Sequence, residues 1–135
     1  EVAAAGIVRR MVWRVKAGDH SSVVEAAGGN LSSVTLDQIF DAARQRDGVA
    51  ISVVRETAKY LGMAAANLVA ITDPEILVLG GIMATAADLF LEVVHTELAR
   101  RLPKPMMDVL TVVPAALGPD AAAIGAARLA AHPLP

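Results

Sequence analysis

The chain has 135 residues, of which 55% are hydrophobic and only 3% aromatic. Much of the apolar content is alanine and valine, and such small side chains favour close helix–helix and helix–sheet packing in an α/β or helical domain. With 12 basic and 14 acidic residues the net charge is -2, which gives no electrostatic argument for a nucleic-acid or membrane-surface partner. The absence of cysteine excludes disulfides and thiolate metal sites within these residues.

No apolar run approaches the roughly 20 residues that are needed to span a bilayer. The N-terminus also lacks the basic region and apolar core of a signal peptide. We therefore expect a cytoplasmic protein. The first residue is glutamate rather than methionine, and we expect that a segment upstream of it is missing.

Apolar side chains recur at helical spacing in residues 2–16, which predicts a helix. Arg9, Arg10 and Arg14 fall on its other faces. Three clustered arginines can form an anion site, but a solvated helix face is the commoner arrangement in a chain of net negative charge. We expect these arginines to face solvent.

Glycine, serine, aspartate and asparagine dominate residues 17–34, where we expect a connection with a short helical turn near 22–27. Thr35 then stands three residues before Gln38. This is the spacing of a capping box, in which each side chain satisfies a free backbone N–H at the start of a helix. A helix is predicted from Thr35 to the break at Asp47-Gly48.

The clearest periodicity lies in residues 49–72, which predicts a helix of roughly 35 Å. Asp73-Pro74 is expected to end it, because proline disfavours the helical conformation in the residue before it. The predicted apolar stripe of this helix consists of Ala50, Val54, Leu61, Ala65 and Leu68.

Two strands and two helices are predicted after this point. Residues 76–79 and 109–113 form apolar, β-prone runs, and residues 86–101 and 121–131 form the helices. A strand–helix–strand unit of this length indicates a parallel crossover. Strands that are apolar on both faces indicate a sheet covered by helices on both sides. Two strands are few for such a sheet, which again suggests that others are missing.

A glycine pair, Gly80-Gly81, follows the first predicted strand. Ligands of open parallel sheets bind beyond the carboxyl ends of the strands, and two glycines permit positive φ and close approach of the backbone to a ring or a phosphate. As a dipeptide alone, the pair is better explained by an ordinary strand-to-helix turn.

In residues 72–81 (TDPEILVLGG) an Asp-Pro step at the end of the long helix is followed by an apolar strand and the glycine pair. This order resembles the adenosine motif of the ROK family of repressors, open reading frames and kinases. Residues 115–127 (AALGPDAAAIGAA) resemble its closing segment, and residues 42–68 the helix pair that precedes the adenosine motif.

This resemblance implies an α/β fold, namely the helix-rich C-terminal lobe of an actin-like ATPase (ribonuclease H-like) fold with a truncated parallel sheet. It implies ATP with Mg²⁺ as cofactor of the full-length protein. The adenosine-binding wall would comprise Gly80, Gly81, Ile82 and Met83. Ile82 replaces a third glycine that many family members carry, and Arg46 stands where a glycine is common.

The resemblance also assigns a role to Glu1, because Glu1–Gly6 is similar to the end of the family's zinc motif. Glu1 would accept hydrogen bonds from a sugar hydroxyl, although a frayed terminal residue explains it equally well. The structural zinc of the full-length protein would have its ligands upstream, as would the D-x-G-x-T phosphate turn and the catalytic aspartate. We therefore expect no catalytic residue and no metal site in these residues, and no phosphoryl transfer by this chain alone.

Histidines offer no alternative site, because His20, His95 and His132 lack metal-ligand spacing. We expect His95 to lie on a helix surface. The domain organisation predicted is a helical part in residues 1–72 and a strand–helix–strand–helix part in residues 73–131.

The full-length protein is interpreted as an ATP-dependent kinase of a hexose or an N-acyl amino sugar, with sugar and ATP as partners. The alternative is the sugar-sensing lobe of a ROK-type transcriptional regulator, and only then would nucleic acid be a partner. A third possibility is a lobe that acts in assembly alone. A homodimer is expected, since family members commonly form dimers through this lobe, and a membrane partner is not expected.

Overall fold

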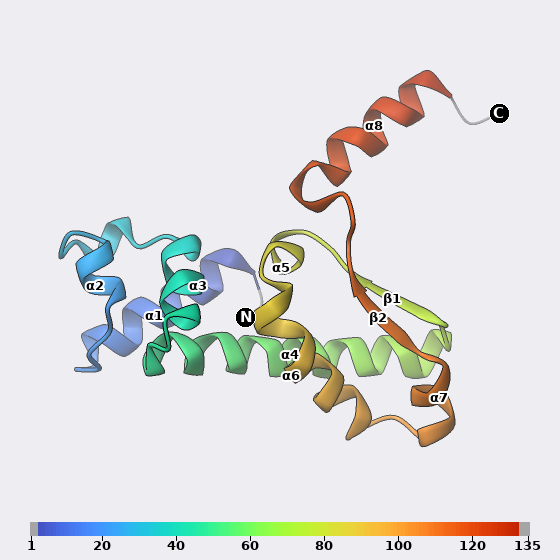
Figure 1. The fold of residues 1–135 in the computed structure, drawn as a ribbon, viewed down its shortest axis with the longest axis horizontal. Coiled ribbons are helices and arrows are strands. Elements are labelled where there is room, and N and C mark those ends of the chain that lie inside the picture. The colour runs from blue at the N-terminus through green and yellow to red at the C-terminus, as the bar shows by residue number, and fades with distance from the viewer. Residues whose placement is uncertain (1–2, 133–135) are drawn as a thin grey trace.

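The computed structural model describes residues 3–132, which form mainly helices, together with one two-stranded sheet beside the C-terminal end of α4 (Gly48–Thr72) (Figure 1). No helix in that part of the chain is both long enough and apolar enough to cross a membrane. The elements in chain order are α1 (Ala4–Lys16), α2 (Val23–Ala26), a 3-10 turn (Leu31–Ser33), α3 (Leu36–Arg44), α4 (Gly48–Thr72), β1 (Ile76–Leu79), α5 (Ile82–Thr85), α6 (Ala87–Ala99), α7 (Lys104–Val109), β2 (Thr111–Pro114), a second 3-10 turn (Gly118–Asp120) and α8 (Ala121–Ala131).

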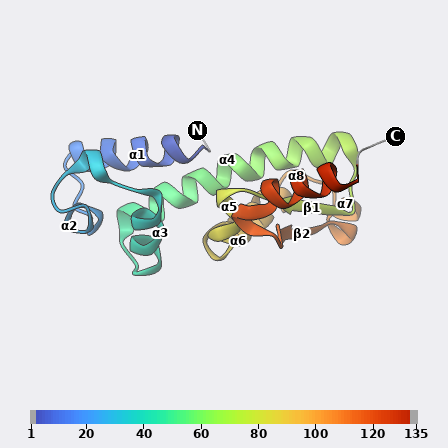
Figure 2. The same ribbon diagram turned by 90° about the horizontal axis from the view of Figure 1, so that it is seen from above.

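Helix α4 extends along most of the molecule, and the other elements are arranged around it (Figures 1 and 2). Helices α1, α3 and α6 all pack against it. It ends as predicted at Asp73, which adopts a left-handed conformation with a φ of 43° before Pro74. The long helix therefore joins the N-terminal helices to the sheet.

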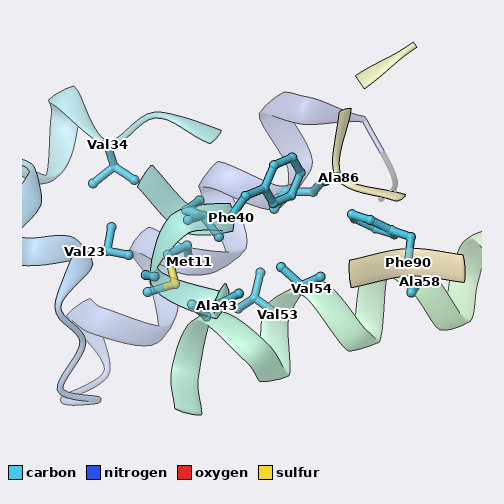
Figure 3. Close-up of a cluster of buried hydrophobic side chains, with 14 of the residues drawn as sticks. Met11, Val23, Val34, Phe40, Ala43, Val53, Val54, Ala58, Ala86 and Phe90 are labelled. Atoms are coloured by element: carbon cyan, nitrogen blue, oxygen red, sulfur yellow. The ribbon is translucent and has the colours of Figure 1, made fainter. Parts of the chain in front are cut away.

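One buried apolar cluster lies between α1, α3, α4 and α6 (Figure 3). At its centre the rings of Phe40 and Phe90 meet edge to face, with centroids 5.7 Å apart and an angle of 83° between their planes. Aromatic rings prefer this geometry because the positive edge of one lies against the negative face of the other. The predicted capping box at the start of α3 is confirmed, with both hydrogen bonds between Thr35 and Gln38 present.

The arginines of α1 differ in their surroundings, and the expected solvated face is found only in part. Arg9 is exposed. Arg10 is half-buried and donates to the hydroxyl of Thr57 at 3.0 Å, while Arg14 forms an ion pair with Asp19. The expectation was wrong for Arg10 and Arg14, because the side of α1 that carries them packs against α4 and against the loop that follows α1.

Asp47 connects the loop before α2 with the start of α4. One carboxylate oxygen accepts hydrogen bonds from the Ser21 hydroxyl at 3.0 Å and from the Ser22 backbone N–H at 2.7 Å. The other oxygen accepts from the N–H of Ala50 at 2.9 Å and so caps α4. Burial acts to raise the pKa of Asp47, but these hydrogen bonds outweigh it and hold the pKa below its ordinary value.

Replacement of Asp47 by asparagine is expected to lower the free energy of unfolding by about 1 kcal/mol at neutral pH, because the amide retains only one acceptor oxygen. A carboxylate whose pKa falls on folding stabilises the fold above its unfolded-state pKa of about 3.9, and this stabilisation is lost as pH falls through the folded-state pKa. Urea unfolding of both proteins from neutral pH to about pH 3 should show the difference shrinking in acid. A pH-independent difference would contradict an ionised Asp47.

Arg46 carries backbone strain, because its φ of 69° lies in the left-handed region. That conformation costs a residue with a β carbon about 1–2 kcal/mol, whereas glycine adopts it freely. Arg46→Gly is therefore expected to raise the free energy of unfolding by about 1 kcal/mol. The control is Arg46→Ala, which keeps the β carbon and should leave thermal unfolding nearly unchanged. Equal stabilisation by both substitutions would assign the effect to the arginine side chain instead.

The two strands pair in parallel, as predicted, in a register that sets Ile76 opposite Thr111 and Leu79 opposite Pro114. The second strand begins two residues later than expected, because Val109 ends the short helix α7. This helix begins just after Pro103, and Pro105 lies in its first turn, where the missing N–H of proline removes no helical hydrogen bond.

Helices cover one face of this sheet. Leu79 packs in a second buried cluster with Val69 of α4 and Leu98 of α6. On the opposite face, Ile76 and Val78 are 60% and 56% exposed. The expectation of helices on both faces is therefore wrong for the described residues, since the strand sequence is apolar on both sides but the helices that pack with Leu79 lie on one face.

Candidate functional site

After β1 the chain turns sharply at Gly80 and Gly81, the glycine pair singled out in the sequence. Gly81 has a φ of 63° and a ψ of -147°, close to a backbone region that is essentially restricted to glycine. A β carbon added at either Gly80 or Gly81 would meet no atom within 4 Å. Conformation therefore requires glycine at position 81, and the open space leaves the backbone of both residues accessible to a ligand.

Ile82 and Met83, the other two residues of the predicted adenosine wall, begin α5 directly after the glycines. Met83 is only 8% exposed and joins the cluster around Phe90. Ile82 is 37% exposed at the surface. The two side chains thus differ in environment, with Met83 anchoring the turn to the core.

An apolar groove of about 300 Å³ lies beside this turn. Gly80 and Met83 line it, together with residues of α4 and β1, whereas Gly81 and Ile82 do not. The lining residues that the site prediction did not include are Leu61, Ala64, Ala65, Leu68, Leu77, Val78 and Leu79. Leu61, Ala65 and Leu68 belong to the predicted apolar stripe of residues 49–72, and residues 77–79 belong to the predicted strand. Leu68 is 53% exposed rather than buried.

No side chain that lines this groove is ionisable. Groups with shifted pKa values lie elsewhere, at Arg44, Asp47 and Asp88. The groove can therefore hold a flat apolar ring by burial and contact, with the glycine backbone beside it for polar groups, but it supplies no acid, base or nucleophile. Its composition suits binding rather than bond-breaking chemistry.

Other predicted positions lie apart from this groove. Glu1 falls outside the described residues. His95 is exposed on α6, as expected, and His20 and His132 are exposed as well. In the part of the chain from residue 3 to residue 132, no group of three or more His, Cys, Asp or Glu side chains is placed to hold a metal ion.

Comparison with known families and proteins gives a consistent result. A model of the ROK family matches residues 12–132. The glucokinase of Thermotoga maritima is 28% identical over 128 residues, which cover 95% of this chain and 40% of that protein. The glucokinase of Streptomyces coelicolor is 33% identical over 122 residues, which cover 87% of this chain and 38% of that protein. The chain thus spans only about 40% of the length of these relatives.

Solved structures include similar folds. A ROK family glucokinase from Streptomyces griseus, in complex with glucose and AMPPNP, matches with a TM-score of 0.78 and 26% identity over 94% of this chain and 42% of its own. A ROK family transcriptional regulator, a homologue of the E. coli MLC protein, matches with a TM-score of 0.74 over 83% of this chain and 27% of its own. At 20% identity, the second match concerns the fold alone.

Proposed function

Because this chain belongs to the ROK family, whose model matches residues 12–132, we propose that the protein it comes from is an ATP-dependent sugar kinase. Its fold is that of the ROK sugar kinases, the actin-like ATPase fold. The sugar would be a hexose or an N-acyl amino sugar. The whole protein would act in the cytoplasm as a homodimer.

The chain's own contribution would be one wall of the adenosine site. The observation that carries this proposal is the turn at Gly80-Gly81: Gly80 lines an apolar groove of about 300 Å³, and Gly81, with a φ of 63°, makes the sharp turn directly after it. An adenine ring could pack between Leu68 of α4 and Val78 of β1, which both line the groove. The glucokinase of Streptomyces griseus, with its bound AMPPNP, is a structural relative that binds a nucleotide.

ATP, when bound, would supply the γ-phosphoryl group, and residues of this chain would hold and orient its adenosine. A general base is needed to deprotonate the sugar hydroxyl, and the groove contains none. We propose that this base, the phosphate-binding turn and the ligands of Mg²⁺ and zinc belong to other parts of the full-length protein. Glu1 would add one contact to a sugar hydroxyl.

The alternative function is the sugar-sensing lobe of a ROK-type regulator. The similarity to the regulator structure, at 20% identity, shows only that the two chains share a fold, so it favours neither function. Kinase and regulator differ in what a nucleotide does: a kinase needs the adenosine wall, whereas a sensor needs only the sugar. Nucleotide binding therefore separates the two.

The test is titration of the 135-residue chain with AMPPNP, followed by the backbone amide signals in NMR spectra. We expect weak, saturable binding that shifts the signals of residues 80–83 and of Leu61 and Leu68. Adenosine alone should shift the same signals, because the groove would hold the ring and not the phosphates. An absence of shifts, or shifts confined to other residues, would overturn the adenosine wall. Sugar phosphorylation by this chain alone would refute the claim that the base lies elsewhere.

A further inference from the structure

A second groove, of about 460 Å³, runs between α4 and α6 and shares no residue with the groove beside β1. Its apolar lining consists of Ala43, Ile51, Val54, Leu89 and Val93. The volume falls within the range of roughly 300–1,000 Å³ that is common for small-molecule sites. The groove is therefore large enough for a ligand of its own.

Two cations form the α4 wall of this groove. Arg55 and Lys59 lie four residues apart on the exposed side of the helix, and both line the groove. In the described part of the chain, neither forms an ion pair with a carboxylate. Their charges are therefore available to a ligand.

The carboxylates on the α6 wall are largely neutralised by other arginines. Asp88 accepts two hydrogen bonds from Arg44, from Nε at 2.9 Å and from Nη2 at 3.0 Å. These bonds hold the pKa of Asp88 below its ordinary value against the opposing effect of its burial. The guanidinium of Arg44 does not line the groove, so this pair neutralises Asp88 without occupying the space.

Glu97 is the second such carboxylate. It is only 4% exposed and bonds the guanidinium of Arg101, while Nη1 of Arg100 lies 3.7 Å from its other oxygen. One buried carboxylate thus serves two arginines, and Arg100 itself lines the groove. Among the lining residues only Glu92 is an acid without an ion-pair partner in the described part of the chain. The lining carries three cations and three carboxylates. Because Arg44 and Arg101 bond two of these carboxylates from outside the groove, positive charge is left at Arg55 and Lys59.

We propose that the groove between α4 and α6 binds an organic phosphate, whose phosphate lies between Arg55 and Lys59 and whose apolar part rests on Ile51, Leu89 and Val93. Phosphate oxygens accept charge-assisted hydrogen bonds from a guanidinium fork and from an ammonium group. Contact with these side chains removes the apolar part of the ligand from water, which favours binding. Both parts of the ligand are needed for binding.

The probe is phenyl phosphate, titrated into the 135-residue chain and followed by backbone amide NMR. We expect shifts that cluster at Ile51, Arg55, Lys59, Leu89 and Val93. Inorganic phosphate, which lacks the ring, and benzyl alcohol, which lacks the charge, should each bind at least about tenfold more weakly, because each loses one of the two contributions. Equal affinity for phenyl phosphate and either reference compound would overturn the proposal.

Two double variants complete the test. Arg55→Gln with Lys59→Gln should weaken phenyl phosphate binding by about tenfold or more, since the charge-assisted hydrogen bonds to the phosphate are lost. Lys16→Gln with Arg128→Gln removes the same charge from exposed positions on α1 and α8 and should leave affinity unchanged. Glutamine keeps helix propensity high, so both variants should fold. Equal losses in the two variants, or no loss in the first, would overturn the site.

Discussion

Replacing Gly62 by alanine is expected to lower the free energy of unfolding by about 2 kcal/mol, although alanine favours helices. Gly62 lies in α4 where α6 crosses it. A β carbon at this position would come within 2.6 Å of Cβ of Glu97 and within 3.3 Å of Cα of Val94. Neither atom is the free end of a flexible side chain, so the two helices would have to move apart.

Two opposing effects decide whether Gly62→Ala raises or lowers the free energy of unfolding. Glycine to alanine inside an exposed helix stabilises by about 1 kcal/mol through helix propensity alone. At this position the added carbon overpacks the interface and displaces Glu97, a buried carboxylate that bonds Arg101. Overpacking costs about 1–3 kcal/mol, and disturbing a buried ion pair adds to that cost. The steric term is therefore expected to exceed the gain in propensity.

Gly48→Ala is the matched control, because Gly48 begins the same helix and a β carbon there would meet no atom within 4 Å. Urea unfolding of the two variants and the parent protein should show a clear loss for Gly62→Ala and little change or a small gain for Gly48→Ala. Comparable stability of the Gly62 variant and the parent would mean that α4 and α6 separate without cost. The close contact would then not hold the fold together.

Gly62 also explains where prediction from the sequence reached its limit. The apolar periodicity of residues 49–72 was sufficient to predict α4, since one face had to be buried. The periodicity could not show which residues of α4 contact α6. Leu68 was predicted to belong to the stripe and is 53% exposed, while Gly62 is buried against Glu97. A glycine in a helix gives no hydrophobic signal, so the closest contact of the two helices was not visible from apolar periodicity.

Short-range rules predicted other elements well. The capping box at Thr35 and the end of α4 at Asp73 depend on neighbouring residues, and both are confirmed. Contacts between distant segments were not predictable in the same way. Arg10 was expected in solvent, but it reaches Thr57 across 47 positions of the sequence. A wheel of one helix shows which residues share a face, but not which helix will cover that face.

The candidate site likewise has one feature that depends on neighbouring residues and one that depends on contacts between distant segments. A local motif located the turn at Gly80-Gly81, because positive φ is a property of the residue itself and the structure has it at Gly81. The groove beside the turn is built from residues of α4, β1 and the turn into α5 that lie as many as 22 positions apart, from Leu61 to Met83. Only their packing brings them together.

Gly81→Ala is expected to lower the free energy of unfolding by about 2 kcal/mol and to abolish the NMR shifts caused by AMPPNP. Alanine at a φ of 63° and a ψ of -147° is strained by about 1–3 kcal/mol, and relief of that strain must rotate the turn that leads into α5. Gly80→Ala is the control, because its φ is not in the left-handed region and a β carbon there would meet no atom within 4 Å. It should change stability by less than about 0.5 kcal/mol.

Loss of nucleotide binding in both variants at preserved stability would indicate that the bare backbone of the pair, rather than the turn at Gly81, contacts the nucleotide. If the Gly81→Ala variant still binds AMPPNP, the turn at Gly81 is not part of the adenosine site, because the conformation that only glycine allows would then have no role in nucleotide binding.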